Sequence, residues 1–487
     1  MTQATKRCPS SGHSDMDPAT AAAEACLAAQ QALGPELVII APVDQSFIDV
    51  NWSETCWAAP SCVVRPTSAQ VLATVLRIIV QFQVLFAIRS GGHSPNPGWA
   101  SIGEPGILLD LSRLDAITVS DDASVVSVGP GQRWGGVVEA LDSHNVTAVA
   151  GRLTSLGVGG LLLGGGFSFF SGEYGLAADN VRSMELVLGN GTIVEASAQE
   201  NPDLFWALKG GGPNYGIVTR FDLVTIPIQK VYAEVVFYAP ADTPTFLRTL
   251  ADWQLKAAAS DPRATVIAVS TLGGTTAGFI YSQPVTARPD IFAAFSDIPV
   301  LATALPPTNL SPLEVMEVSA GQVGWTANRH DYRGVSTQID GDLYVDMYNF
   351  WAERAADVYS KTGANQTFVI QPITTNLAKQ GVDKGGNALG MTPSSSMSWW
   401  TTLIDWENAA DDDVVRSVSI ATTEEWKKRS TVELLYMNDC SRDQDPLSSY
   451  GAENVAKLCE VSHKYDPDQV FQKLQHDGFL LRKLGVC

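Results

Sequence analysis

The chain has 487 residues, of which 45% are hydrophobic and 17% are charged. At about 150 residues per domain this length predicts roughly three structural units, and together with the apolar content it excludes both a single small binding module and a disordered chain. The 32 basic and 52 acidic side chains give a formal net charge of −20. Because such a surface repels phosphate backbones and anionic lipids, we expect a soluble protein without nucleic-acid or membrane partners. A monomer is expected.

The first twenty residues contain no apolar run typical of a signal peptide. The protein is therefore either intracellular, or secreted with its signal removed. Cysteines confined to both ends of the chain, the acidic charge and five glycosylation sequons favour secretion of a glycoprotein. The sequons begin at Asn51, Asn145, Asn190, Asn309 and Asn365.

An N-terminal helix is predicted to begin with Asp17 as N-cap and Pro18 at its first position. Cys26 lies on this helix, and a disulfide to Cys56 or Cys62 is one interpretation. Ordinary buried thiols are the other.

Short strands and glycine-rich turns follow as far as about residue 227. A helix capped by Thr67 or Ser68 is predicted to run to about residue 81 and to precede a strand over 84–88. The Asn190-Gly191 step predicts a tight hairpin. Further strands are expected at 107–111, 125–128, 184–188, 192–195 and 217–223, and helices at 134–143 and 202–208.

From residue 230 to about 425 the glycine clusters thin out, and strands alternate with helices such as 243–257. This pattern predicts a second α+β unit whose sheet walls a pocket, with Trp399, Trp400 and Trp406 in its core. His330 and Asp331 are expected in a surface loop. The last segment, 450–474, is predicted to be an amphipathic helix.

Two glycine clusters indicate a ligand-binding backbone. The first, RSGGHS at 89–94, follows a strand, and its paired glycines allow consecutive N–H groups to converge on a pyrophosphate. The second spans 155–160 and 164–166. Tight packing around bulges is the alternative for each, but two clusters, one with a histidine, favour a ligand. Neither is a Walker loop or a Rossmann fingerprint, so a nucleotide cofactor on a different fold is expected.

Six motifs, taken in chain order, resemble the berberine bridge enzyme-like flavoproteins, whose FAD-binding domain is of the vanillyl-alcohol oxidase, or PCMH, type. They are VRPTS at 64–68, RSGGHS at 89–94, GVGG at 157–160, DLFWALKGGG at 203–212, NYGIV at 214–218 and YDP at 465–467. The resemblance runs from about residue 26 to 474 and is weak between 230 and 425.

The resemblance implies an α+β fold with a two-subdomain FAD-binding domain and an antiparallel substrate-binding sheet. The expected parts are an N-terminal segment with a helix (1–57), the FAD-binding domain (58–229), the substrate-binding domain (230–430) and a C-terminal segment that returns to the FAD domain (431–487).

The resemblance also implies that His93 bonds covalently to the flavin 8α-methyl, which makes the flavin a better hydride acceptor. The backbone of the 89–94 turn is expected to bind the pyrophosphate, and residues 216–218 to lie near the adenosine. No metal is expected. The remaining residues implied to bind the cofactor are Arg89, Ser90, Gly91, Gly92, Ser94, Ser155, Leu156, Gly157, Gly159, Gly160, Gly216, Ile217, Val218 and Asn438.

Three positions depart from the family pattern. Leu153 replaces the cysteine of a second flavin link, so a single covalent bond through His93 is predicted. Leu156 occupies the position at which family members that react with oxygen usually have a valine. Leucine there is typical of members that hinder oxygen, so the expected electron acceptor is either O2 or another compound. Asp439 replaces a tyrosine base in Tyr436-Met437-Asn438-Asp439.

Asp439 and Tyr436 are the predicted catalytic residues. The Asp439 carboxylate is expected to act as a general base or to orient a cationic amine, and a solvated loop carboxylate is the alternative interpretation. Tyr436 and Asn438 are expected to contact the pocket or the flavin.

These residues predict an FAD-dependent oxidoreductase, an oxidase or a dehydrogenase, that takes a hydride from a C–H bond next to oxygen or nitrogen. Because carbohydrate oxidases of the family usually keep the cysteine and the tyrosine, a small natural product is favoured as substrate over an oligosaccharide. A cyclase or isomerase that uses FAD as scaffold, an oligosaccharide oxidase and a non-catalytic flavin binder are the alternatives.

Overall fold

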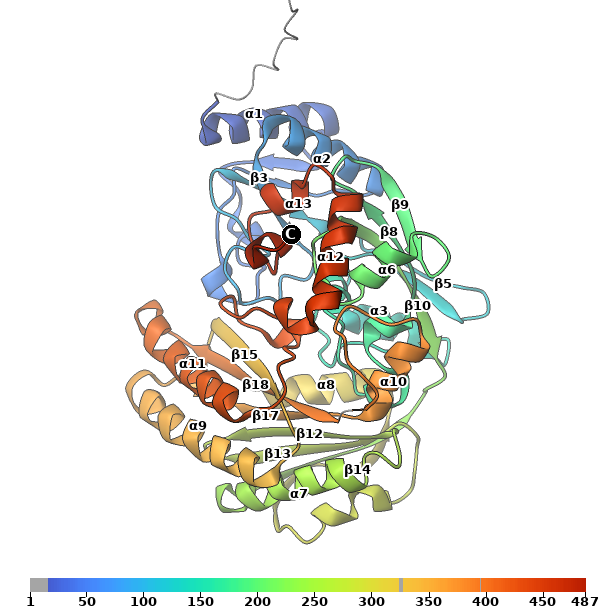
Figure 1. The fold of residues 1–487 in the computed structure, drawn as a ribbon, viewed down its shortest axis with the longest axis vertical. Helices are drawn as coiled ribbons and strands as arrows, with labels where there is room; N and C mark the ends of the chain where they lie inside the picture. The colour runs from blue at the N-terminus through green and yellow to red at the C-terminus, as the bar shows by residue number, and fades with distance from the viewer. Residues whose placement is uncertain (1–15, 324–326, 395) are drawn as a thin grey trace, which may run out of the picture.

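The computed structural model describes residues 16–323, 327–394 and 396–487. In these residues the strands form three sheets, one of four, one of six and one of eight strands. Figure 1 shows the first two sheets in the upper half of the molecule and the third in the lower half. The predicted mixed fold with antiparallel sheets is confirmed.

Helix α1 (Pro18–Leu33) begins as predicted, because the Asp17 carboxylate accepts hydrogen bonds from the backbone N–H groups of residues 19 and 20. The Cys26–Cys62 disulfide ties this helix to strand β2 (Cys62–Val64), which confirms one of the two predicted pairings. A second disulfide joins Cys459 to Cys487.

The first sheet has the order β1-β2-β4-β3, with β2 and β3 parallel to β4. Helix α2 (Ala69–Phe82) covers it and is capped by Ser68, whose Oγ accepts from the N–H of Val71 at 3.3 Å. Its buried Leu72, Leu76 and Ile79 follow the helical repeat and face the sheet. The other strands are β1 (Val38–Ile40), β3 (Leu85–Arg89) and β4 (Gly106–Asp110).

The second sheet has the order β5-β6-β10-β8-β9, with β7 paired to β10. The expected hairpin joins β8 to β9, and Gly191 in its turn has a φ of +78°, which favours glycine. The strands are β5 (Ile117–Val119), β6 (Val125–Val128), β7 (Thr147–Ala148), β8 (Val181–Val187), β9 (Ile193–Ser197) and β10 (Ile217–Ile226).

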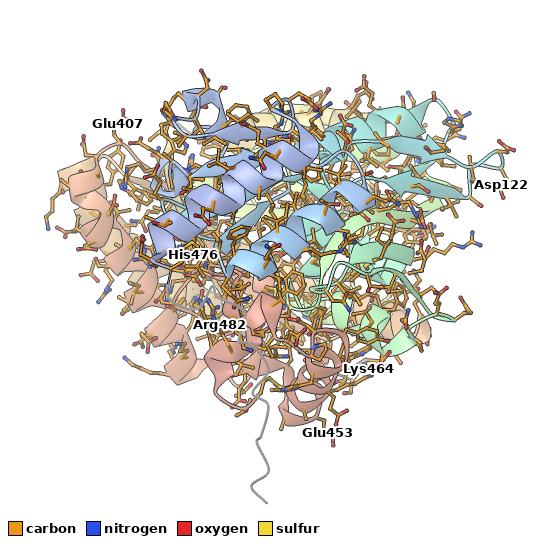
Figure 2. All side chains as sticks on the ribbon, turned by 90° about the horizontal axis from the view of Figure 1, so that it is seen from above. Asp122, Glu407, Glu453, Lys464, His476 and Arg482 are labelled. Atoms are coloured by element: carbon orange, nitrogen blue, oxygen red, sulfur yellow. A yellow bond between two sulfur atoms is a disulfide. The ribbon has the colours of Figure 1, made fainter. Side chains whose placement is uncertain are left out.

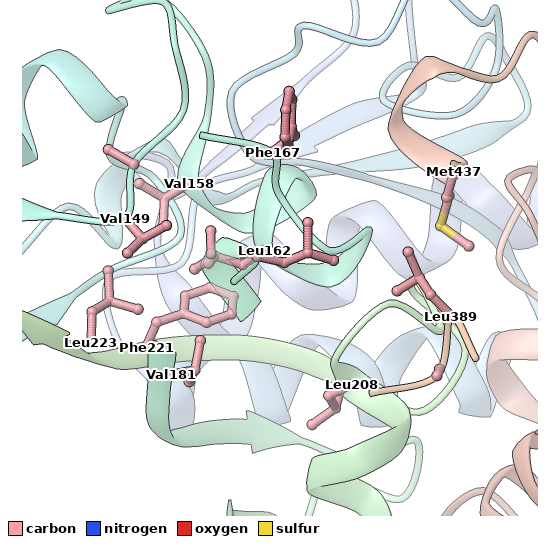
Figure 3. Close-up of a cluster of buried hydrophobic side chains, with 14 of the residues drawn as sticks. Val149, Val158, Leu162, Phe167, Val181, Leu208, Phe221, Leu223, Leu389 and Met437 are labelled. Atoms are coloured by element: carbon pink, nitrogen blue, oxygen red, sulfur yellow. The ribbon is translucent and has the colours of Figure 1, made fainter. Parts of the chain in front are cut away.

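The helices of this half lie against the second sheet. Figure 3 shows Val158 and Leu162 of α4 packed near Phe221 and Leu223 of β10, within a buried hydrophobic cluster. This packing holds the second glycine cluster, which begins α4, against a rigid sheet. The helices are α3 (Trp134–Asp142), α4 (Val158–Leu163), α5 (Ser171–Tyr174) and α6 (Pro202–Leu208).

The third sheet has the order β14-β11-β13-β12-β17-β18-β15, with β16 paired to β18, and every pairing in it is antiparallel. Its strands are β11 (Val231–Tyr238), β12 (Ala264–Thr271), β13 (Gly274–Tyr281), β14 (Val300–Leu310), β15 (Arg329–Thr337), β16 (Asn365–Gln366), β17 (Phe368–Ile373) and β18 (Met397–Trp406).

Three helices cover the outer face of this sheet, and the inner face looks toward the first two sheets (Figure 1). The outer helices are α7 (Thr243–Lys256), α9 (Gly341–Thr362) and α11 (Asp412–Arg429). Two further helices, α8 (Pro312–Val323) and α10 (Thr375–Asp383), are drawn between the sheet and the upper half.

The predicted tryptophans of β18 are buried on both faces of the sheet. Trp399 stacks on Tyr436 in the hydrophobic cluster on the inner face of the sheet, here called the inner cluster. Trp400 packs against Phe368 and Trp426 in the cluster beneath the outer helices, here called the outer cluster. Adjacent strand residues point to opposite faces, so these two consecutive tryptophans pack into the hydrophobic clusters on the two sides of the sheet.

The expectation of a surface loop for His330 and Asp331 is wrong. Both lie buried in β15, and Asp331 pairs with Arg416 of α11 at 2.9 Å. The strand alternates, with Arg329 and Arg333 on the same side as Asp331, each bonded to a carboxylate. Ion pairs to the covering helix and its following loop thus allow a highly polar segment to form an interior strand.

The C-terminal segment packs back onto the first sheet. The Phe86 N–H of β3 donates to the Leu474 carbonyl at 2.9 Å, and the His476 N–H donates to the Phe86 carbonyl at 2.7 Å. The segment contains α12 (Ala452–Tyr465) and α13 (Val470–Lys473), which lie beside the first sheets in Figure 1.

Charged side chains such as Asp122, Glu453 and Lys464 project from the molecular surface (Figure 2). Among the described helices, none combines the length and the apolarity needed to cross a bilayer.

Candidate active site

The first glycine cluster forms a buried turn directly after β3. Gly92 has a φ of +64°, a conformation that favours glycine, and its carbonyl accepts from the Trp52 N–H at 2.9 Å. The turn presents the His93 ring to the Trp52 indole, with ring centroids 4.4 Å apart and planes 16° apart. Burial, and then the charge of Arg133, lower the pKa of His93 to about 3, so its imidazole is neutral at physiological pH.

The two glycine clusters meet. A Cβ on Gly91 would lie 2.4 Å from Gly157 Cα, and a Cβ on Gly159 would lie 2.9 Å from Ser90 Oγ. Only glycine permits this approach of the two backbones. The clusters, about sixty residues apart in the chain, therefore form one surface, as a shared ligand requires.

The chemistry of this surface fits the pyrophosphate of FAD. Gly91 and Gly92 are buried, and within the described ranges neither backbone N–H donates to a protein acceptor. Buried N–H groups normally have a partner, and phosphate oxygens accept from such groups. The residues present thus fit the cofactor that the sequence predicts.

Other predicted cofactor residues have clear structural contacts. The Arg89 guanidinium pairs with Asp110 at 2.8 Å and donates to the Phe47 carbonyl, which ties β3 to β4 and to the preceding segment. The Ser155 carbonyl accepts from the Arg133 guanidinium, which fixes the loop before α4. Leu156 is partly buried and packs against the inner cluster.

The other three predicted residues lie at the start of β10. Gly216 directly precedes this strand, and a Cβ there would lie 2.8 Å from Leu186 Cδ1. Ile217 and Val218 pair with β8. All three residues therefore lie against β8.

Asp439 is the last residue of a short 3-10 helix, Met437–Asp439, which lies against Gly334 of β15 in the third sheet. Its Oδ2 accepts from Gln371 Nε2 of β17 at 2.6 Å, and Gln371 Oε1 in turn accepts from Arg152 Nη2. Burial raises the pKa of Asp439 to about 6, although the Arg152 charge and the Gln371 hydrogen bond oppose this. The carboxyl is partly exposed and is held by the hydrogen bond from Gln371, and its role as a general base stays a prediction.

Tyr436 and Asn438 hold the second glycine cluster in place. The Tyr436 hydroxyl oxygen accepts from the N–H groups of Gly166 and Phe167 at 3.0 and 2.9 Å, and from Asn438 Nδ2 at 3.1 Å. Asn438 Nδ2 also donates to the Leu161 carbonyl of α4 at 3.0 Å. Burial, and then the neighbouring Asp439, raise the pKa of Tyr436, so its phenol stays protonated.

The inner side of β15 joins these parts into one site. His330 stacks on Trp52, with centroids 4.1 Å apart, and burial lowers its pKa to about 4. The next inward residue, Tyr332, has its ring centroid 6.2 Å from that of Trp52, and burial together with the Asp439 charge raises its pKa. Strand β15 therefore lies against both Trp52, which stacks on His93, and Asp439, whose Cβ would lie 3.1 Å from a Cβ on Gly334.

The sequence interpretation missed Trp52, Tyr332, Gln371 and Arg152. Gln371 had a usable signal, because it is a single amide in the apolar strand 368–373. Arg152 adjoins Leu153, which replaces the cysteine of the family pattern. Trp52 gave no signal, since its role depends on how the N-terminal segment folds over the turn. In the described residues no group of His, Cys, Asp and Glu side chains is arranged to hold a metal.

Comparison with protein families and curated relatives gives one consistent result. The model of an FAD binding domain matches residues 60–197. An FAD-dependent monooxygenase of Arthrobotrys oligospora is 37% identical over 439 residues, which cover 89% of this chain and 84% of the relative. The bifunctional solanapyrone synthase of Alternaria solani is 32% identical over 435 residues, covering 88% and 83% of the two chains.

Solved structures with the same fold include 6-hydroxy-D-nicotine oxidase from Arthrobacter nicotinovorans, with a TM-score of 0.75, 21% identity and coverage of 90% of this chain and 96% of that one. Another is the glucooligosaccharide oxidase of Acremonium strictum, whose FAD is 6-S-cysteinyl and 8α-N1-histidyl, with a TM-score of 0.74, 18% identity and coverage of 92% and 97%. These neighbours share the PCMH-type fold, and the sequence relatives are FAD-dependent enzymes. The chain therefore belongs to the family of FAD-dependent oxidoreductases that includes these fungal monooxygenases, and it shares its fold with a berberine bridge enzyme-like protein of Physcomitrella patens.

Proposed function

We propose that this protein oxidises a small natural-product-type substrate, with Asp439 as the proton acceptor and with FAD attached through His93 as its single covalent link. The observation that carries the proposal is the Asp439 carboxyl, which accepts from Gln371 at 2.6 Å, has its pKa raised to about 6 and lies beside β15, the strand whose His330 stacks on the same Trp52 as His93. Bound FAD supplies the hydride-accepting chemistry.

Asp439 is suited to remove a proton from the substrate. A general base works best when its pKa lies near the operating pH, and a value of about 6 leaves the carboxylate mostly ionised at pH 7. Gln371 fixes the orientation of the carboxylate by donating to one of its oxygens. Tyr436 positions the 164–167 loop through the two hydrogen bonds that it accepts from Gly166 and Phe167, and we assign it an orienting role beside the base.

Covalent attachment through His93 is supported by the state of its ring. An imidazole that stays neutral retains a nitrogen lone pair, which bond formation to carbon requires. The histidyl linkage named for the Acremonium strictum enzyme is a precedent on the same fold. Because Leu153 has no thiol, the cysteinyl link of that enzyme has no counterpart here.

The electron acceptor is O2 or another compound. Leu156, with its larger side chain in place of the family's valine, favours slow reaction of the reduced enzyme with oxygen. Stopped-flow reoxidation of the wild type and of Leu156→Val tests this assignment, and the valine variant should reoxidise faster.

Anaerobic addition of candidate substrates to the purified holoenzyme tests the redox proposal. A panel of small aromatic and polyketide-type alcohols should contain compounds that bleach the visible flavin absorbance, whereas a cello-oligosaccharide should not. Asp439→Asn should slow bleaching by about 100-fold or more, the usual contribution of a general base. Product formation without bleaching would refute the redox function.

That refuting outcome would support the second candidate, a cyclase or isomerase that keeps FAD as scaffold. The specific observation in its favour is the relative named a bifunctional synthase. The product's mass separates the two, because isomerisation leaves it unchanged and oxidation does not.

We further propose that the protein is a monomeric glycoprotein of the secretory pathway, active in secondary metabolism. Asn145 and Asn190 are exposed and accessible to a glycosyltransferase. Asn51 is buried and donates to the Cys56 carbonyl, so it is not a glycosylation site. The intact mass of protein from the native source, before and after endoglycosidase treatment, tests this assignment, and an unchanged mass would favour an intracellular location.

A further inference from the structure

Arg152 differs from the other enclosed arginines of the molecule. Arg89, Arg333 and Arg416 each contact a carboxylate directly, at 2.8, 2.6 and 2.9 Å. Arg152, in contrast, donates to the neutral Gln371 amide. Among the described residues no carboxylate forms an ion pair with Arg152, although removing a guanidinium from water without a directly bound anion is costly.

Gln371 also keeps Arg152 and Asp439 apart. Its carbonyl accepts from Arg152 and its amide N–H donates to Asp439, so it spans the two opposite charges. Gln371 itself is buried, whereas Arg152 and Asp439 both retain accessible surface. The site therefore presents a cation and a carboxylate side by side, neither fully neutralised by a direct partner.

The guanidinium plane is held in a fixed orientation. The Arg152 guanidinium lies over the Phe167 ring, 5.0 Å from its centroid, and Phe167 packs edge-on against Trp399. A fixed, planar fork of N–H donors next to an aromatic ring matches a planar oxygen anion on a conjugated substrate.

We propose that Arg152 binds an oxyanion of the substrate, such as a carboxylate, phenolate or enolate, while Asp439 accepts the proton from the neighbouring hydroxyl. This inference rests on the proposed function and defines its substrate class. It disfavours a cationic amine, because an ammonium group at Asp439 would be repelled by the adjacent guanidinium.

Three phenyl compounds that differ in the charge of their single substituent test the charge preference on the holoenzyme: benzoate, benzyl alcohol and benzylamine. Each is titrated into the wild type while the visible flavin spectrum is recorded. Benzoate should perturb the spectrum with a Kd at least tenfold below those of the other two. Benzylamine binding as tightly as benzoate, or no perturbation by benzoate, would overturn the inference.

Two variants assign the preference to Arg152. Arg152→Gln should weaken benzoate binding by about 10- to 100-fold, the loss expected for a charge-assisted hydrogen bond. Arg152→Lys keeps the charge without the fork and should lose less. The matched control is Arg248→Gln, which removes an exposed arginine paired with Asp342 on the far face, and its benzoate Kd should stay at the wild-type value. An unchanged Kd in Arg152→Gln would overturn the inference.

The same titrations distinguish failure of this inference from failure of the proposed function. A yellow holoenzyme whose flavin spectrum does not change on addition of benzoate would overturn the oxyanion site and would leave the proposed redox function unaffected. A protein that purifies without any flavin overturns the proposed function and, with it, this inference.

Discussion

The raised pKa of Asp439 should make stability depend on pH, and Asp439→Asn isolates that dependence. The pKa rises from 3.8 to about 6, a shift of about 2 pH units. At about 1.4 kcal/mol per unit this corresponds to about 3 kcal/mol. Because the folded-state pKa lies above the unfolded value, this contribution to the free energy of unfolding is fully present below pH 3.8. It is lost as the pH rises through 6.

The asparagine variant cannot ionise and should not show this loss. Unfolding entropies of about 2 cal/mol/K per residue give a chain of 487 residues about 1 kcal/mol/K, so the difference in melting temperature should grow by about 3 °C in favour of the variant between pH 4 and pH 7. Differential scanning calorimetry at four pH values measures it. A difference that stays constant with pH would refute the reasoning, since a constant offset reflects packing alone.

Asp443→Asn is a control of opposite sign. Burial alone would raise the pKa of Asp443, but the hydrogen bonds and charge of Arg333 lower it to about 2. A depressed pKa stabilises the folded state above the unfolded value of 3.8. This variant should therefore lose stability relative to the wild type at pH 7.

Two further predictions concern the FAD-binding half. Gly91→Ala should abolish flavin retention, because its Cβ would lie 2.4 Å from Gly157 Cα. The control Gly103→Ala, whose Cβ would have no atom within 4 Å, should retain flavin. Equal flavin content in the two proteins would contradict the proposed contact. Replacing Cys26 or Cys62 by serine opens a link across 36 residues and should cost about 4 kcal/mol, or about 4 °C in melting temperature. The double variant should be no less stable than either single one, and additive losses would argue against the pairing.

Local signals in the sequence predicted the elements that depend on local chemistry. The caps at Asp17 and Ser68 and the Asn190-Gly191 turn all lie as expected, because each depends on residues adjacent in the chain. The two glycine clusters were also recognisable, and their contact through Gly91 and Gly157 explains why glycine occurs at both.

Features that depend on distant partners were not predictable in the same way. Residues 329–333 read as a polar loop because the carboxylates that neutralise their charges lie about 80 to 110 positions further along the chain, as with Asp412 and Asp443. The Arg152–Gln371–Asp439 chain draws on three separate segments, so no local window contains it. Without those partners, Asp439 could not be distinguished from a solvated carboxylate.

Acid precipitation tests the central claim most directly, namely that this enzyme holds FAD through one covalent bond to His93. The wild-type pellet should remain yellow after denaturation in trichloroacetic acid, and its flavin should stay with the peptide that contains residue 93. The His93→Ala pellet should be colourless, with any flavin released into the supernatant. A colourless wild-type pellet, or a yellow His93→Ala pellet, would contradict the account.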